Sequence, residues 1–148
     1  MVYSMEELSG IDPLLVPKHI AMIMDGNRRW ATMNGLPLMM GHWEGAEILG
    51  ELVKAAAELG VRTLTVYAFS TENWGRPKDE VEDLMHIFEL YLMRKQEAMV
   101  KDGVKLGAIG DLSRLPESVL HAFHQAKNAT EHCDRIHLVL ALNYGVRD

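Results

Sequence analysis

Apolar residues gather in four short segments of the chain, separated by longer stretches with a different spacing. Ile20 to Met24 is an uninterrupted apolar run, and Arg62 to Phe69 is rich in β-branched and aromatic residues. Val104 to Ile109 and Ile136 to Leu142 have a similar character. Short apolar runs bounded by turn residues are typical of strands buried in a parallel sheet. The pattern therefore predicts four strands.

Between these segments, apolar residues recur at helical spacing. We predict one helix from about Gly41 to Leu59 and a second from about Asp79 to Lys101. A third begins near Pro116, because proline suits the first turn of a helix. The acids Glu80 and Glu82, at the start of the second helix, are expected to be capping or solvent-facing charges.

The alternation of strands and helices indicates an α/β fold. We expect a parallel sheet with helices packed on both faces, four strands of which lie in this chain. The connections between successive strands should be right-handed. Residues 1–18 contain two prolines and show little periodicity, so we expect an N-terminal arm. Residues 19–148 then form one domain, long enough to bury a core.

Each predicted strand ends in a polar cluster. Asp25 to Arg29 follows the first strand and Ser70 to Arg76 follows the second. Gly110-Asp111 and Asn143 to Arg147 follow the third and fourth. Parallel strands place their carboxyl ends at one edge of the sheet, where ligands bind in open α/β folds. We therefore expect these clusters to form one crevice.

The residue types in that crevice favour an anionic ligand. Arginines such as Arg28, Arg29 and Arg76 grip phosphate groups with forked donors, and backbone amides at glycine turns and helix starts add to them. Asp25 has the wrong sign for an anion unless it holds a metal or handles a proton. A carboxylate among phosphate-binding groups suggests Mg²⁺ shared with phosphate oxygens. His42, at a helix start, is either a phosphate contact or a helix-start residue. For the first cluster alone, the alternative is a capping turn followed by solvated arginines.

The apolar stripes of the first two helices have two interpretations. Leu49 and Val53 on one helix could face Leu84 and Phe88 on the next. Plain core packing explains such stripes. An apolar tunnel that opens at the phosphate site also explains them, and would suit an amphiphile with a charged head and a hydrocarbon tail.

Composition narrows the class of protein. The chain has 148 residues, of which 48% are hydrophobic and 24% charged, an ordinary globular composition. The net charge of −6 argues against a nucleic-acid partner. The single cysteine, Cys133, excludes an internal disulfide and a cysteine metal cluster. We find neither the ~20-residue apolar run of a membrane helix nor a signal peptide, and expect a reducing, cytoplasmic setting.

Several motifs together resemble one enzyme family. In order and spacing they are similar to the cis-prenyltransferases, above all the bacterial undecaprenyl diphosphate synthases, over nearly the whole chain. Each block alone is weak support, whereas the ordered set is specific. The blocks are Met24 to Ala31, Gly41-His42, Tyr67 to Pro77, Glu80-Val81, Ile109 to Asp111, and Asn143 to Gly145.

The resemblance implies a transferase that lengthens an allylic diphosphate, typically farnesyl diphosphate, with isopentenyl diphosphate units in cis geometry. The product would be a polyprenyl diphosphate lipid carrier. The resemblance also implies Mg²⁺ as cofactor and a homodimer for the full-length protein. It further implies a cytoplasmic enzyme that touches the membrane peripherally through its lipid product.

Roles for individual residues follow by matching positions. Asp25 matches the family's essential aspartate, which coordinates Mg²⁺ and promotes the departure of diphosphate. Asn73 matches the residue proposed to take part in proton removal. The matched substrate contacts are Gly26, Asn27, Arg28, Arg29, Trp30, His42, Ser70, Thr71, Glu72, Trp74 and Arg76. The positions that fall where the family lines its hydrocarbon tunnel are Ala46, Leu49, Val53, Leu84 and Phe88.

The sequence departs from the family pattern in two places. Leu38 stands where the family usually has an arginine that contacts diphosphate. The family also continues past Asp148 with two strands that carry the isopentenyl diphosphate segment, a late glutamate for Mg²⁺ and much of the dimer interface. We therefore expect residues 19–148 to be a C-terminally incomplete domain, with little or no turnover by itself.

Two other functions stay open. The chain could be a non-catalytic homologue that binds a prenyl diphosphate or a partner subunit without turnover. It could also be a generic phosphate-handling α/β enzyme, such as a phosphatase with Asp25 as nucleophile, although Ser70 to Arg76 then has no clear role.

Overall fold

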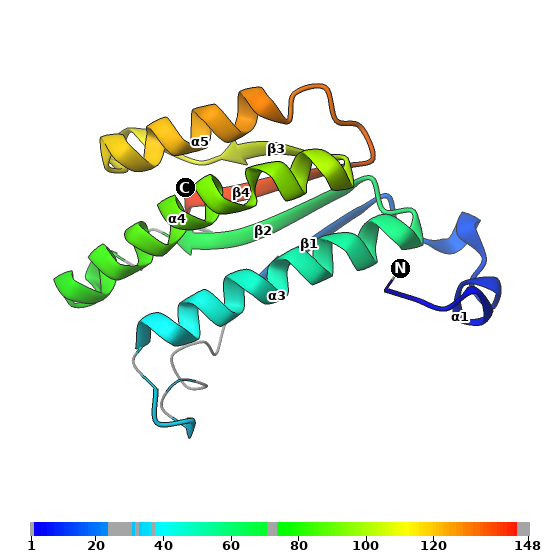
Figure 1. Ribbon diagram of the computed structural model, residues 1–148, viewed down its shortest axis with the longest axis horizontal. Coiled ribbons are helices and arrows are strands. Elements are labelled where there is room, and N and C mark those ends of the chain that lie inside the picture. The colour runs from blue at the N-terminus through cyan, green and yellow to red at the C-terminus, as the bar shows by residue number, and fades with distance from the viewer. Residues whose placement is uncertain (1, 24–30, 32, 37, 71–73, 145–148) are drawn as a thin grey trace.

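A computed structural model describes residues 2–23, 31, 33–36, 38–70 and 74–144 of the chain (Figure 1). Four strands alternate with three long helices, and two short helical turns precede the first strand. The strands are β1 (His19–Ile23), β2 (Thr63–Ser70), β3 (Val104–Ile109) and β4 (Ile136–Tyr144). The helices are α1 (Met5–Ser9), η1 (Pro13–Leu15), α3 (Leu38–Leu59), α4 (Lys78–Asp102), η3 (Leu112–Arg114) and α5 (Glu117–Ala129).

The four strands form one parallel sheet in the order β1-β2-β4-β3. The predicted strands are all confirmed, with ends within two residues of those expected. The α/β fold with an all-parallel sheet and packed helices is therefore confirmed. The first long helix begins at Leu38, three residues before the expected Gly41.

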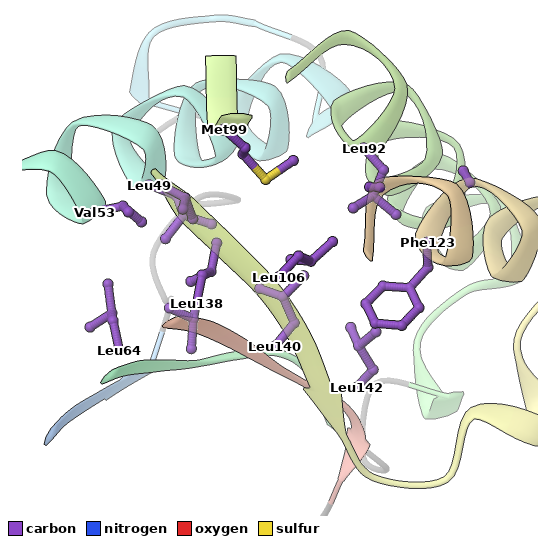
Figure 2. Close-up of a cluster of buried hydrophobic side chains, with 14 of the residues drawn as sticks. Leu49, Val53, Leu64, Leu92, Met99, Leu106, Phe123, Leu138, Leu140 and Leu142 are labelled. Atoms are coloured by element: carbon purple, nitrogen blue, oxygen red, sulfur yellow. The ribbon is translucent and has the colours of Figure 1, made fainter. Parts of the chain in front are cut away.

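The three long helices cover one face of the sheet. Figure 2 shows Leu64, Leu138 and Leu140 of the strands directed toward the helices above them. These side chains are buried together with residues from all three helices, so one apolar core fills the space between the two layers. The helix residues in that core include Leu49, Val53, Leu92, Met99, Val119 and Phe123.

The opposite face of the sheet carries none of these long helices. Lys105 and Ile109 of β3, which point away from the core, are exposed, and Ile23 of β1 is 76% exposed. The expectation of helices on both faces is thus met on one face by the described elements. On the open face, His19 Nε2 lies 2.7 Å from the Thr65 hydroxyl.

The connection through α5 differs in hand from the other two. The sheet order shows that α3 and α4 link strands that advance across the sheet, whereas α5 links β3 back to β4. Because all three helices lie on the same face, the α5 connection must have the opposite hand to the first two. The prediction of uniformly right-handed connections is therefore wrong for one of them. Burial of Phe123 in the shared core accounts for this placement.

Helix α4 begins and ends by different means. Its N-cap is Pro77, with no side-chain hydrogen bond at the cap, so the expected capping role of Glu80 and Glu82 is wrong. At the other end, Gly103 adopts φ +74° and its N–H bonds back to carbonyls of the last turn. That left-handed conformation is one that glycine adopts without strain.

The N-terminal residues are tied to the domain by one side chain. The backbone N–H groups of Val2 and Tyr3 donate to the carboxylate of Glu58, at 2.6 and 3.2 Å. These hydrogen bonds lower the pKa of Glu58 below its usual value. Ser4 and Glu7 form a capping box at the start of α1. Among the described residues, no helix has the length and apolar character needed to cross a membrane.

Candidate functional site

The carboxyl ends of the four strands meet at one edge of the sheet. In the register, Ile23 lies beside Tyr67, Tyr67 beside Ala141, and Ala141 beside Ile109. The last residues of β1, β2, β3 and β4 therefore lie along the same edge. Register shifts between Tyr67 and Ser70 mark an irregularity where β2 approaches this edge. The predicted convergence of strand ends is confirmed for the described residues.

Many expected site residues fall outside the part of the chain that the structure describes. They are Asp25, Gly26, Asn27, Arg28, Arg29, Trp30, Thr71, Glu72 and Asn73. For His42 in α3 and Ser70 in β2, the backbone is described and the side chain is not. Their predicted roles at the carboxyl edge therefore stay predictions.

Trp74 is joined to the end of β4 by a hydrogen bond. Its indole Nε1 donates to Asn143 Oδ1 at 2.6 Å, and Asn143 Nδ2 donates to the backbone carbonyl of Asp111 at 2.9 Å. Asn143 is 6% exposed and has φ +48°, a left-handed conformation that asparagine tolerates better than most residues. One buried amide therefore links the segments that follow β2 and β3.

A second contact reaches Trp74 from the same side of the site. The guanidinium carbon of Arg114 lies 4.2 Å from the centre of the Trp74 ring, a cation–π arrangement. Arg114 is in η3, whose N-cap is Asp111. Hydrogen bonds from the Ser113 hydroxyl and N–H to the Asp111 carboxylate lower the pKa of Asp111. Asp111 is thus a capping residue of η3.

Arg76 is held by a buried carboxylate. Its Nη1 lies 3.0 Å from Glu80 Oε1, and the two residues are four positions apart at the start of α4. The Glu80 side chain is 3% exposed and that of Arg76 is 39% exposed. A buried carboxylate beside a half-exposed guanidinium fixes the direction of the cation while its other face can meet solvent or a ligand. The solvent-facing position expected for Glu80 is therefore wrong.

A groove of about 520 Å³ opens beside Trp74 and Arg76. It runs between the first half of α4 and the start of α5, and Arg114 lies on its wall. Val81, Met85 and Val119 supply apolar surface, and Lys78 and His86 supply polar surface. None of the five expected tunnel residues lines this groove.

The expected tunnel residues lie in or against the core between α3 and α4. Leu49 and Val53 are 5% and 3% exposed, and Leu84 and Phe88 pack half-buried against the same cluster. Ala46 is half-buried on α3. The two helices are also joined by an ion pair between Lys95 Nζ and Glu47 Oε2 at 3.0 Å. The two stripes thus belong to one apolar cluster, and the tunnel itself stays a prediction.

Sequence reasoning missed three residues that organise this edge. Glu80 was treated as a surface charge, although its position four residues after an arginine is the spacing of a helical ion pair. Arg114 has no predicted role, and Asn143 is predicted only as a member of the polar cluster that follows the fourth strand. An asparagine directly after a buried strand is a signal for a left-handed turn, and could have indicated the Asn143 conformation.

The chemistry of a metal site depends on residues outside the described part. Among the described residues, no group of three or more histidine, cysteine, aspartate or glutamate side chains could hold a metal ion. The expected ligand Asp25 lies outside those residues, so an Mg²⁺ site at this edge stays a prediction. One carboxylate at a diphosphate site fits Mg²⁺, which takes its other ligands from phosphate oxygens and water.

The fold and this edge define an α/β protein with arginine-bearing segments after parallel strands. Comparison with known proteins identifies the family. The profile described as "Putative undecaprenyl diphosphate synthase" matches residues 23–148. The chain belongs to this family, the cis-prenyltransferases.

Individual relatives agree with that assignment. An isoprenyl transferase from Thermotoga maritima is 46% identical over 132 residues, which is 89% of this chain and 57% of the relative. The structure of lavandulyl diphosphate synthase from Lavandula x intermedia, a complex with dimethylallyl diphosphate, superposes with a TM-score of 0.84 and 36% identity. The structure of a probable undecaprenyl diphosphate synthase from Campylobacter jejuni has a TM-score of 0.69 and 37% sequence identity. The match to the Lavandula structure covers 89% of this chain and 57% of that protein. The match to the Campylobacter structure covers 88% of this chain and 56% of that protein.

The chain thus spans about half the length of the relatives that it matches. Isoprenyl transferases are enzymes of isoprenoid synthesis, so the family function is prenyl transfer. The substrates, products and assembly of this particular chain are proposals.

Proposed function

We propose that this chain forms the allylic-diphosphate side of a cis-prenyltransferase site. The observation that carries the proposal is the Arg76–Glu80 pair at the carboxyl edge, in a chain that belongs to the isoprenyl transferase family. The guanidinium of Arg76 is fixed by Glu80 and half exposed, as a diphosphate ligand requires. The lavandulyl diphosphate synthase relative binds an allylic diphosphate, dimethylallyl diphosphate, which supports the same class of substrate here.

The chemistry starts with the allylic C–O bond. When that bond breaks, negative charge develops on the leaving diphosphate and positive charge on the allylic carbon. Arg28, Arg29 and Arg76, with the backbone N–H groups of Gly26 and Asn27, would stabilise the diphosphate more strongly as its charge grows. Asp25 would hold Mg²⁺, which when bound neutralises further charge on the diphosphate oxygens.

The second half of the reaction forms a carbon–carbon bond. The double bond of isopentenyl diphosphate attacks the allylic carbon, and loss of a proton completes the new isoprene unit. Asn73 would take part in that proton removal. The apolar surface of Leu49, Val53 and Phe88 would keep water from the allylic cation and receive the growing hydrocarbon. Farnesyl diphosphate as starter, cis geometry and a polyprenyl product are parts of this proposal.

Calorimetry with the 148-residue chain tests the binding step. We expect farnesyl diphosphate to bind in the presence of Mg²⁺ and farnesol, which lacks the diphosphate, to bind far more weakly. Substitution Arg76→Met should weaken binding by roughly 10–100-fold, the value of one charge-assisted contact of about 1.5–3 kcal/mol. Arg62→Ala serves as a control, because Arg62 is exposed at the amino end of β2. Equal binding of farnesol and farnesyl diphosphate would refute the proposal.

A turnover assay separates an enzyme from a binding module. With Mg²⁺, farnesyl diphosphate and labelled isopentenyl diphosphate, we expect little or no elongation by these 148 residues. The segment that the family uses for isopentenyl diphosphate has no match among them. Binding without turnover fits both the allylic half of an enzyme and a non-catalytic partner module. Elongation by a longer protein that contains this chain, with loss on Asp25→Ala, would decide for the enzyme.

The cellular setting is proposed on the same basis. We place the protein in the cytoplasm, with peripheral contact to the membrane through its lipid product, and as a homodimer in full-length form. Sedimentation of a full-length protein that contains this chain measures the oligomeric state, and a monomer at micromolar concentration would contradict the homodimer.

A further inference from the structure

Asn143 occupies the central point of the carboxyl edge. It is the second-last residue of β4, which lies between β2 and β3 in the sheet. Both ends of its amide are used: Oδ1 accepts from Trp74 and Nδ2 donates to Asp111. The orientation of the amide is unambiguous, because an indole N–H can only donate and a backbone carbonyl can only accept. The side chain is 6% exposed, so water does not replace these bonds easily.

Asn143 and Arg114, which both contact Trp74, connect it to the segment between β3 and α5. Asn143 holds the indole edge and itself bonds to the Asp111 carbonyl, while Arg114 covers the ring face. Asp111 and Arg114 are the N-cap and last residue of η3. The tryptophan is thereby fixed to the connection between β3 and α5. Its ring also packs half-buried against the apolar core.

Fixing Trp74 also restricts Arg76. Only Gly75 separates the two residues, and Arg76 is anchored on its far side by Glu80 in the first turn of α4. The short segment from Trp74 to Glu80 is thus held at both ends. Without Asn143, the first anchor would lose its hydrogen bond, and glycine next to Trp74 would give the backbone freedom to move.

We propose that Asn143 is a positioning residue, which sets Trp74 and Arg76 against the diphosphate of the allylic substrate. This inference rests on the proposed function. Asn143 acts through Trp74 and Arg76 and need not touch the substrate. Its effect should therefore appear in the affinity for the diphosphate, beyond any effect on folding.

Asn143→Gly is the decisive variant, because glycine adopts φ +48° without strain and loses only the side-chain bridge. A purely backbone role for Asn143 predicts that this variant binds like the wild type. Positioning predicts that its Kd for farnesyl diphosphate, measured by calorimetry, rises about tenfold, the equivalent of one lost hydrogen bond. Trp74→Phe removes the indole donor and should give a similar rise. The Kd of the double variant should exceed the higher of the two single-variant Kd values by no more than about twofold, because both substitutions remove the hydrogen bond between Trp74 and Asn143.

A destabilised variant away from the site provides the matched control. The hydroxyl of Thr130 is buried and lies 3.0 Å from the backbone nitrogen of Leu106, at the other end of α5 from η3. Thr130→Val should lower the Tm and leave the Kd for farnesyl diphosphate unchanged. If Thr130→Val and Asn143→Gly weaken binding equally for equal loss of Tm, Asn143 has a structural role only and the inference is wrong.

The indole resonance gives a readout that does not need the ligand. In ¹⁵N–¹H spectra, the Nε1–H of Trp74 should shift and lose protection from solvent exchange in Asn143→Gly. Wild-type binding that survives Asn143→Gly unchanged overturns this inference and leaves the proposed function intact. Absence of farnesyl diphosphate binding by the wild type overturns the proposed function and, with it, the positioning role.

Discussion

The pair of Arg76 and Glu80 makes a quantitative prediction about folding as well as binding. Removing one partner of a fully buried ion pair lowers the free energy of unfolding by about 3–5 kcal/mol, because the remaining charge stays buried without a partner. An exposed pair contributes only about 0.2–1 kcal/mol. Glu80 is 3% exposed but Arg76 is 39% exposed, so solvent screens one partner and the pair lies between these limits. We therefore expect Arg76→Met to lower the free energy of unfolding by about 1–3 kcal/mol.

The assay is a double-mutant cycle by urea and thermal unfolding. For a chain of this size, each 1 kcal/mol changes the Tm by about 2–4 °C, so the expected loss is readily measured. Glu80→Gln keeps an oxygen acceptor for Arg76 and removes the buried charge, so it should cost less than Arg76→Met. In the Glu80→Gln background, Arg76→Met should then cost less than in the wild type. The double variant should therefore be more stable than Arg76→Met alone. Its diphosphate binding can then be measured with less unfolded protein present.

A second pair in the same helix serves as the control. Lys78 and Glu82 have the same spacing at 3.8 Å, but their side chains are 88% and 63% exposed. The corresponding cycle, with Lys78→Met and Glu82→Gln, should show a coupling energy near zero. If the Arg76–Glu80 cycle is likewise additive within about 0.5 kcal/mol, the buried pair does not anchor Arg76 and the argument is refuted.

Three further predictions concern the scaffold. Thr130→Val should lower the free energy of unfolding by about 1–3 kcal/mol in urea titrations, because the buried N–H of Leu106 loses its acceptor, and Thr130→Ser should cost less. Gly103→Ala should cost about 1–3 kcal/mol by thermal unfolding, because φ is +74° and the new Cβ would lie 2.8 Å from Arg135 Cβ; unchanged Tm would contradict this. Burial, aided by neighbouring lysines, lowers the pKa of His137 from its ordinary value of 6.5, so the unfolded chain takes up the proton first as pH falls. Stability should therefore rise with pH through the window just below 6.5 and level off above it, a slope that His137→Gln should abolish.

The strands and helices were predictable because their signals are local. The apolar run before Asp25 and the stripe that contains Leu84 and Phe88 depend on neighbours within a few residues. The strand is confirmed, but the burial expected for it is wrong: Ile20 and Met22 are half-buried and the other residues of β1 are exposed, because β1 is the edge strand and its second face is open. The handedness of the α5 connection was not predictable from spacing. It depends on which face buries Phe123, and the alternation of apolar residues in β3 leaves only the face that α3 and α4 already cover.

The candidate site was predictable as a location, but its supporting contacts were not. That strand ends converge follows from parallel order alone. That Asn143 bridges Trp74 and Asp111 depends on the sheet order, which places β4 between β2 and β3. Asn143 is 69 positions from Trp74 and 32 positions from Asp111, so the local sequence gives no sign of either contact. The burial of Glu80 was not predictable for the same reason, because tertiary packing determines which residues surround its side chain.

The two edges of the sheet differ in how they would meet another chain. At the β3 edge, the backbone nitrogen of Leu106 is already occupied by Thr130, and Lys105 adds an exposed charge. Among the residues that the structure describes, the β1 edge has neither protection: His19 to Ile23 contains no lysine, arginine, aspartate or glutamate, and Ile23 is 76% exposed. Edge strands that lack charges and bulges are templates for strand addition. Self-association of the isolated 148 residues should therefore start at β1, which makes that strand the first place to engineer solubility.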